Sequence, residues 1–157
     1  MNFEELIGSS GVYAASLIVG FVSGLVPFVN SEVYLLLVST TVSKPALAPV
    51  AVLSAIGQMG AKTVLFYAGR GMLKVPMGRH QNRIESVQAK FLEWEGRAGL
   101  MMFVSAAVGF PPFYAVSVVA GSLKLNVIKF EVAGLIGRTI RFGVIVYFPQ
   151  LVMRFID

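Results

Sequence analysis

The chain contains no cysteine and a single histidine, His80. The absence of cysteine excludes disulfides, thiolate nucleophiles and thiolate metal sites. Common enzyme signatures are also missing: the sequence has no GxxxxGK phosphate-binding loop, no HExxH and no GxSxG. We therefore expect a protein that is not an enzyme and that needs neither a cofactor nor a metal ion.

Charge is scarce as well. Charged residues make up 13% of the sequence and hydrophobic residues 56%, whereas ordinary globular domains carry roughly 25% charged residues. Residues 6–31 and 100–123 contain no charge at all, and a membrane-spanning helix needs roughly 20 apolar residues. The composition therefore predicts an all-α, multi-pass integral membrane protein.

The N-terminus has no basic residue ahead of the first apolar run, where the only charges are Glu4 and Glu5. A cleaved signal peptide carries positive charge at this position. We therefore expect the first hydrophobic segment to be retained.

Hydrophobic residues fall into four blocks within one membrane domain, residues 1–157. Block 11–43 is broken at 27–30, block 46–69 is whole, and a polar linker covers 70–97; block 98–121 is then broken at 109–112, and block 127–152 is whole. Broken segments at matching positions of two halves, here 11–69 and 98–153, are typical of inverted-repeat transporters. The breaks contain Pro27, Asn30 and Ser31 in the first half, and Gly109, Pro111 and Pro112 in the second. We interpret both as re-entrant hairpins; the alternative is two proline-kinked spanning helices.

The distribution of basic residues favours the hairpins. If both broken blocks enter and leave on one side, Lys44 and Arg154 lie on one face of the membrane and eight basic residues lie on the other. These eight are Arg70, Lys74, Arg79, Arg83, Lys90, Arg97, Lys124 and Lys129. The positive-inside rule then places the linker in the cytoplasm and both termini outside. The net charge of +5 is explained by this orientation, so we expect no nucleic-acid partner.

The first break creates a helix start that holds a carboxylate. Asn30 or Ser31 is a suitable N-cap, and Glu32 follows in the first turn, where the helix dipole favours an anion. The arms 17–26 and 33–42 would each be about 15 Å long, half of a bilayer. Glu32 would then lie near mid-depth, where a charged residue marks a functional site.

Candidate partners for Glu32 lie on the two whole blocks. Glu131, Arg138 and Arg141 fall within roughly 80° of one another on a helical wheel, and we expect Glu32 to cluster with the two arginines. Gln58 and Lys62 share a face of the other block, although Lys62 could instead extend its amine to the cytoplasmic side. The second break offers Tyr114 and backbone groups to a polar cavity between the hairpins.

The linker shows helical periodicity. Its apolar stripe comprises Ile84, Val87, Phe91, Trp94 and Ala98, and its basic residues Arg79, Arg83, Lys90 and Arg97 lie beside the stripe. This pattern predicts a helix lying in the membrane interface or, equally well, an amphipathic helix packed on the membrane domain. We expect Gly96 and Gly99 to end it.

Three motifs follow one another in the sequence. The first is PFVNSE, residues 27–32; the second comprises Gly57, Gly60, Tyr67, Gly69 and Arg70, and the third Pro111, Ala120, Gly121, Phe130 and Gly134. In this order and spacing they resemble the patterns of the DedA family, also called SNARE-associated or VTT-domain membrane proteins, with PFVNSE resembling its proline–glycine–glutamate signature. The resemblance covers residues 20–148, and the short length looks most like the YqaA-type branch.

The resemblance implies two opposed re-entrant hairpins and transbilayer movement of a phospholipid or a polyprenyl phosphate, in the inner (plasma) membrane of a bacterium. Its partners would be anionic lipids or lipid phosphates, with proton or sodium coupling and homo-oligomerisation left open. Lys62 stands where the family often has an acidic residue, and the second break lacks the family's arginine, which puts proton coupling in doubt. A secondary transporter of a small solute or ion, or a non-transporting assembly protein, remains the alternative.

Overall fold

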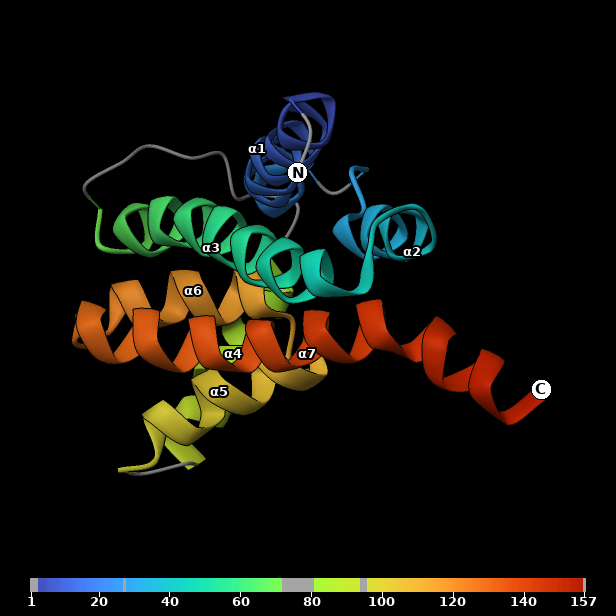
Figure 1. Ribbon diagram of the computed structural model, residues 1–157. Helices are drawn as coiled ribbons and strands as arrows, with labels where there is room; N and C mark the ends of the chain where they lie inside the picture. Colours follow the sequence, from blue (N-terminus) through green and yellow to red (C-terminus); the bar gives the residue numbers. More distant parts are fainter. Residues whose placement is uncertain (1–2, 27, 72–80, 94–95, 157) are drawn as a thin grey trace. The chain divides into compact units, whose positions relative to one another are not determined.

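The structure is a computed structural model that describes residues 3–26, 28–71, 81–93 and 96–156 (Figure 1). These residues form seven α-helices and no β-strand, which confirms the all-α prediction for this part of the chain. The helices are α1 (Phe3–Leu25), α2 (Ser31–Thr41), α3 (Lys44–Gly69), α4 (Gln81–Glu93), α5 (Ala98–Val108), α6 (Phe113–Ser122) and α7 (Val127–Ile156).

Both broken blocks are interrupted at the predicted positions, and both whole blocks form long helices. α3 and, in α7, the segment Val127–Pro149 are long and apolar enough to cross a membrane by length and composition. The short helices α2, α5 and α6 have 11, 11 and 10 residues, close to half a bilayer at about 1.5 Å per residue. α1 differs from expectation: it has 23 residues instead of a ten-residue arm, because the helix continues towards the N-terminus through Gly11 and Gly8.

The described part of the linker helix is α4, and the next helix begins at Ala98, the predicted start of the third block. α4 ends at Glu93, and Gly96 has a positive φ of 73°, a conformation that glycine adopts without strain. Ala98 and Gly99 already belong to α5, so the prediction that Gly99 ends the linker helix is wrong. Arg79 and Trp94 lie outside the described residues.

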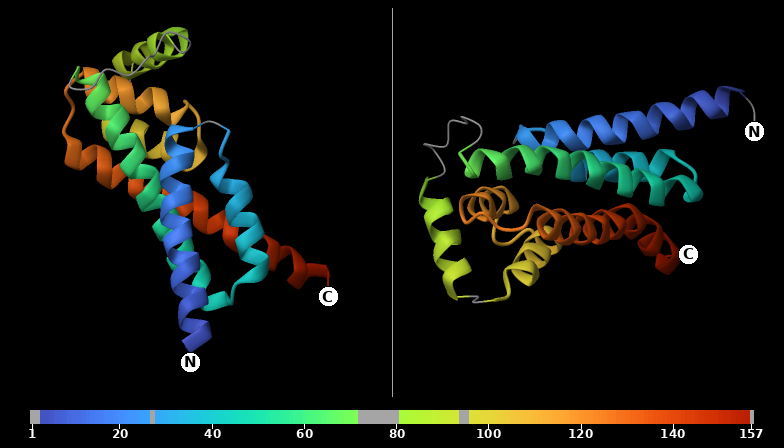
Figure 2. Two further views of the ribbon diagram at one scale, coloured as in Figure 1. Left: turned by 90° about the horizontal axis from the view of Figure 1, so that it is seen from above. Right: turned by 90° about the vertical axis from the view of Figure 1, so that its left-hand side faces the viewer.

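Two compact units make up the chain, residues 1–58 with 139–157 and residues 59–138, and α3 and α7 contribute to both. In the first unit, α1 and α2 form an antiparallel pair (Figure 2). The hydroxyls of Ser16 and Tyr34 join the two helices by a hydrogen bond of 3.0 Å. Tyr34 also donates to the carbonyl of Val12 at 3.4 Å.

Glycines allow α1 and α3 to cross so closely that their backbones are in contact. The space for a Cβ on Gly20 is occupied by the backbone of Ser54, and that on Gly57 by the carbonyl of Leu17. One glycine from each helix therefore faces the backbone of the other. Such close approach maximises van der Waals contact where neighbouring helices have only apolar surfaces to share.

The second unit repeats this device between α3 and α6. A Cβ on Gly69 would meet the carbonyl of Val118, and one on Gly121 would meet the carbonyl of Phe66. Beside this crossing, the ring of Phe130 stacks on Phe66 at 4.8 Å and on Phe113 at 5.7 Å between centroids. The aromatic stack forms the centre of a continuous apolar core.

The apolar stripe of α4 is buried in that same core. Val87 and Phe91 are nearly inaccessible, and Ile84 packs against the cluster, where α4 lies against α6. Of the two interpretations of the linker, the structure therefore supports an amphipathic helix packed on the protein. The exposed side of α4 is mostly polar and carries charges of both signs: Arg83, Glu85 and Glu93 are exposed.

Candidate functional site

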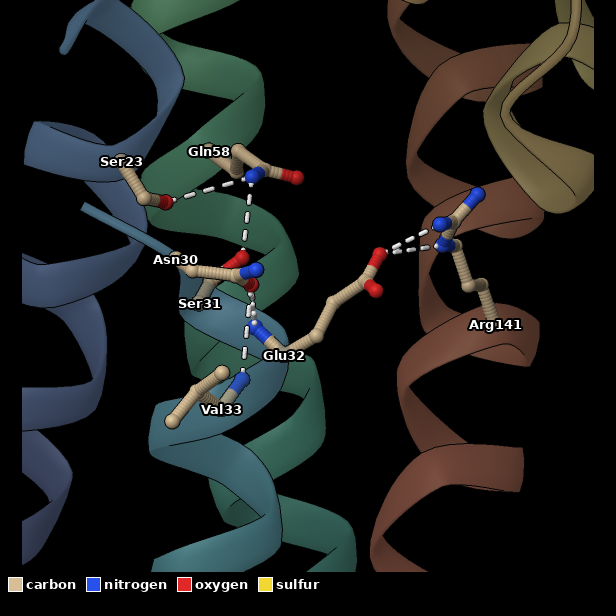
Figure 3. Close-up of polar contacts among 7 residues, drawn as sticks. All are labelled: Ser23, Asn30, Ser31, Glu32, Val33, Gln58 and Arg141. Atoms are coloured by element: carbon tan, nitrogen blue, oxygen red, sulfur yellow. Dashed lines mark hydrogen bonds and ion pairs between the residues drawn. The ribbon is translucent and has the colours of Figure 1, made fainter. Parts of the chain in front are cut away.

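The first break in the hydrophobic sequence ends at a capped helix. The side-chain oxygen of Asn30 accepts hydrogen bonds from the backbone N–H of Glu32 at 2.8 Å and of Val33 at 3.4 Å (Figure 3). Asn30 is therefore the N-cap of α2, and Ser31 is its first helical residue. Pro27 lies outside the described residues.

Ser31 has a different role from the predicted one. Its hydroxyl accepts a hydrogen bond of 3.1 Å from the Gln58 amide, which also reaches the hydroxyl of Ser23 at 3.2 Å (Figure 3). One amide thus connects α1, α2 and α3 beside the break. Because Gln58 and Ser31 are buried, these bonds satisfy polar groups that would otherwise be costly to remove from solvent.

Glu32 forms an ion pair with Arg141, 109 residues later in the sequence. Arg141 donates from Nε to Oε1 of Glu32 at 2.8 Å, and a second, short hydrogen bond runs from its terminal NH2 to the same oxygen (Figure 3). The side chains of Arg141 and Glu32 are 26% and 38% exposed. Both bonds from Arg141 go to one carboxylate oxygen, Oε1.

The predicted arginine pair divides between the two units. Arg141 belongs to the first unit and pairs with Glu32, whereas Arg138 belongs to the second. There its guanidinium lies 4.8 Å from the ring centroid of Phe113, a cation–π contact. Arg138 and Lys62 are both buried, and they are close enough for their like charges to repel each other.

Glu131, the remaining charged candidate, is held by a residue that the sequence did not single out. The hydroxyl of Thr63 donates a short hydrogen bond to Oε1 of Glu131 and lies 2.8 Å from the carbonyl of Met59. Thr63 lies next to Lys62 on α3, but a threonine in an apolar helix usually bonds to its own backbone. Its long-range partner could not be read from the sequence.

The second break turns the chain through a glycine and two prolines. Gly109 ends α5 with a φ of 89°, a left-handed conformation that favours glycine, and Pro112 precedes α6. The hydroxyl of Ser105 donates to the carbonyl of Pro111 and so satisfies a backbone acceptor within the turn. Tyr114, the predicted polar residue of this break, accepts a 3.4 Å hydrogen bond from Arg83 of α4.

The structure thus describes two polar centres. The centre in the first unit comprises Ser23, Ser31, Glu32, Gln58 and Arg141. The centre in the second unit comprises Lys62, Thr63, Glu131 and Arg138, with Phe113 beside the arginine. The sequence suggested the charged members, Ser31 and Gln58, whereas Ser23 and Thr63 gave no signal. Their hydroxyls matter only because another helix brings a partner to them.

Comparison with known proteins gives no relative. The chain matches no protein-family model, no curated protein and no solved structure.

Proposed function

We propose that this chain is a multi-pass integral membrane protein that moves a phospholipid or a polyprenyl phosphate across the bilayer. The observation that carries the proposal is the partly exposed Glu32–Arg141 pair, which lies within strongly apolar helices. A guanidinium binds phosphate oxygens through its planar array of donors. Arg141 donates both hydrogen bonds to one oxygen of the Glu32 carboxylate. One of these bonds can be exchanged for a bond to a lipid phosphate.

Exposed apolar surface supports the membrane environment. α7 carries a row of exposed apolar side chains spaced three or four residues apart, which places them along one gradually turning stripe. The row comprises Ile128, Val132, Ile136, Ile140, Val144, Tyr147 and Phe148. It extends over about 30 Å of helix, the thickness of the hydrocarbon core. Lipid acyl chains are the partner that such a stripe fits.

The surface of α1 and α2 has the same character. Exposed apolar residues on these two helices include Ile18, Phe21, Leu25, Val33, Leu36 and Leu37. Val33 directly follows Glu32 in the first turn of α2, and Leu36 and Leu37 lie in the next turn. A charged pair at the edge of an apolar surface is costly in hydrocarbon, and in membrane proteins such pairs mark a substrate pathway.

Each half contributes a re-entrant hairpin in this proposal, formed by α1 with α2 and by α5 with α6. Close glycine contacts support an internal repeat: Gly57 of α3 meets the backbone of α1, and Gly137 of α7 meets the backbone of α5 at Phe103. In each half, the long helix therefore crosses the first helix of the hairpin at a glycine. The resemblance to DedA-family proteins leads to the same arrangement.

The chemistry assigned to the polar residues is binding and release, without bond making. Arg141 receives the phosphate, Glu32 competes with it for the guanidinium and so keeps binding reversible, and acyl chains remain in the bilayer. Within the second unit, the buried Lys62 and Arg138 form a separate positively charged centre that suits an anionic headgroup. Glu131 and Tyr114 contribute hydrogen-bonding groups.

Purified protein in liposomes tests the proposal. Fluorescent phospholipid in the outer leaflet is quenched by an impermeant reductant, and transfer of a labelled polyprenyl phosphate is measured in parallel. We expect protein-dependent transfer of one or both lipids, and a large loss of transfer in Glu32→Gln protein relative to Glu85→Gln, a control on the exposed face of α4. Uptake of a soluble ion or solute without lipid transfer would support the secondary transporter instead. If neither lipid nor solute is transferred, the result would support the third alternative, a non-transporting assembly protein.

A further inference from the structure

A second polar region lies at the α4 face of the second unit and shares neither Glu32 nor Arg141. An open cavity of about 380 Å³ is lined by Arg83, Ser86, Val87 and Lys90 of α4 and by Phe110, Pro111 and Pro112 of the second break. It is adjoined by a cavity of about 260 Å³ lined by Lys90, Glu93, Met101, Val104, Phe110 and Pro111. Lys90, Phe110 and Pro111 are common to both.

The two basic side chains that line the larger cavity make few contacts with its other lining residues. Arg83 makes one long hydrogen bond, 3.4 Å from its NH1 to the hydroxyl of Tyr114. The ammonium of Lys90 lies 4.2 Å from the ring centroid of Phe110, a contact that uses the charge but leaves its three N–H donors available. Two basic residues, seven positions apart on one face of α4, therefore point over the same hollow.

No acidic residue among those described lines the larger cavity. Glu93 lines only the smaller cavity, and Glu85 lines neither. The described charged residues in the lining of the larger cavity are therefore both basic, Arg83 and Lys90.

The smaller cavity has the opposite chemistry. Apart from Lys90 and Glu93 at its edge, its lining is apolar: Met101, Val104, Phe110 and Pro111. The ring of Phe110 is 65% exposed and forms a wall of both hollows. A ligand that fills them together has an anionic head and an apolar continuation.

We infer that this double cavity binds the phosphate ester of an anionic lipid, with Arg83 and Lys90 holding the phosphate and Phe110, Met101 and Val104 contacting the beginning of the acyl chains. Arginine and lysine are the common protein donors to phosphate, and basic pockets between the helices of membrane proteins bind lipid headgroups. The site is separate from the Glu32–Arg141 pair.

Binding is tested on the full-length protein in a non-ionic detergent by native mass spectrometry. The probes are dihexanoyl phosphatidic acid, dihexanoyl phosphatidylcholine and free glycerol 3-phosphate. We expect phosphatidic acid to bind at least about tenfold more tightly than phosphatidylcholine, because the choline headgroup brings its own positive charge. Glycerol 3-phosphate, which lacks the apolar part, should bind about tenfold more weakly than phosphatidic acid.

Variants locate the site. Arg83→Gln with Lys90→Gln should weaken phosphatidic acid binding at least about tenfold, and Phe110→Ala about fivefold, with less effect on glycerol 3-phosphate. The matched control, Lys124→Gln with Lys129→Gln, removes the same charge from exposed positions of the same unit and should change binding less than about threefold. All these side chains are on the surface, and helical content by circular dichroism checks that the variants fold.

Each other result overturns all or part of the inference. Equal losses in the Arg83/Lys90 and the Lys124/Lys129 variants would show non-specific attraction to basic surface. Equal affinity for phosphatidic acid and phosphatidylcholine would exclude recognition of the anionic head. Equal affinity for glycerol 3-phosphate and phosphatidic acid, lost in the Arg83/Lys90 variant, would make this a site for a soluble phosphate ester and exclude the lipid. Because the readout is binding, failure here is distinct from failure of the proposed lipid transfer.

Discussion

Arg141 on α7 binds a single oxygen of the Glu32 carboxylate, with its Nε 2.8 Å from Oε1. Glu32 is positioned for this contact because Asn30 caps α2 and so fixes the direction of the first turn. A local feature of the sequence, the N-cap, thus prepares a contact made across 109 residues. The predictions below start from this pair and extend to the helix cap, the helix crossings and the membrane topology.

Removing either charge of the pair should reduce lipid transfer by about tenfold or more, because the remaining charge is left without its partner in an apolar setting. Arg141→Lys should be intermediate, since an ammonium does not reproduce two adjacent guanidinium donors. Transfer rates in liposomes check this, with Arg97→Gln as an exposed arginine control. Wild-type rates in Glu32→Gln protein would exclude a role of the carboxylate in transfer.

The double variant Glu32→Gln with Arg141→Gln separates stability from function. Thermal unfolding in detergent should give a coupling energy of about 1 kcal/mol between the two positions, as for a partly exposed ion pair. The double variant should therefore recover stability relative to either single variant, while transfer stays low. Recovery of transfer together with stability would show that the two charges serve only to pair with each other.

Asn30→Ala should destabilise the protein by about 1 kcal/mol, because the N–H groups of Glu32 and Val33 lose their acceptor. Asn30→Ser is the matched control: a serine hydroxyl also caps helices, so its loss of stability should be small. Transfer should fall with Asn30→Ala as the first turn of α2 loosens and Glu32 is held less firmly. Equal stability of the two variants would mean that the cap contributes nothing.

Gly57→Ala should destabilise the first unit by about 1–3 kcal/mol, because a methyl group there meets the carbonyl of Leu17 on α1 and backbone must move. Gly143→Ala is the control, in the other long helix, α7. Nothing lies within 4 Å of a Cβ at Gly143, so the substitution should be neutral or stabilising by up to about 1 kcal/mol through helix propensity. Thermal midpoints of the two proteins in the same detergent measure the difference.

Single cysteines introduced into this cysteine-free chain test the topology. With re-entrant hairpins, Asn82→Cys and Lys124→Cys should react with an impermeant maleimide from the same side of the membrane, and Lys44→Cys from the other. All three positions are exposed, so labelling is limited by sidedness. Reaction of positions 82 and 124 from opposite sides would show that residues 98–122 span the membrane and would remove the basis of the inverted repeat.

The sequence by itself determined the helical class and the positions of the helices. The features that determine them act over only a few residues, so their consequences can be predicted locally. These features are the uncharged apolar runs, the prolines Pro111 and Pro112, and the Asn30 N-cap followed by Glu32. The breaks at 27–30 and 109–112 and the long helices α3 and α7 were located in this way. The length of α1 was underestimated because the sequence before residue 11 is only moderately apolar, and helix propensity continues where hydropathy falls.

Tertiary structure decided which polar groups meet. A helical wheel places Arg138 and Arg141 on one side of α7 but does not say which neighbour each one faces, and it is Arg141 that binds Glu32 while Arg138 lies over Phe113. Thr63 gains its carboxylate partner in the same way, from a helix 68 residues away. These pairings depend on how close helices approach, and that distance is set by glycines such as Gly57 and Gly121 whose neighbours are distant in sequence. The periodicity of a helix shows which residues share a face, but only the packing of the helices decides which two faces are in contact.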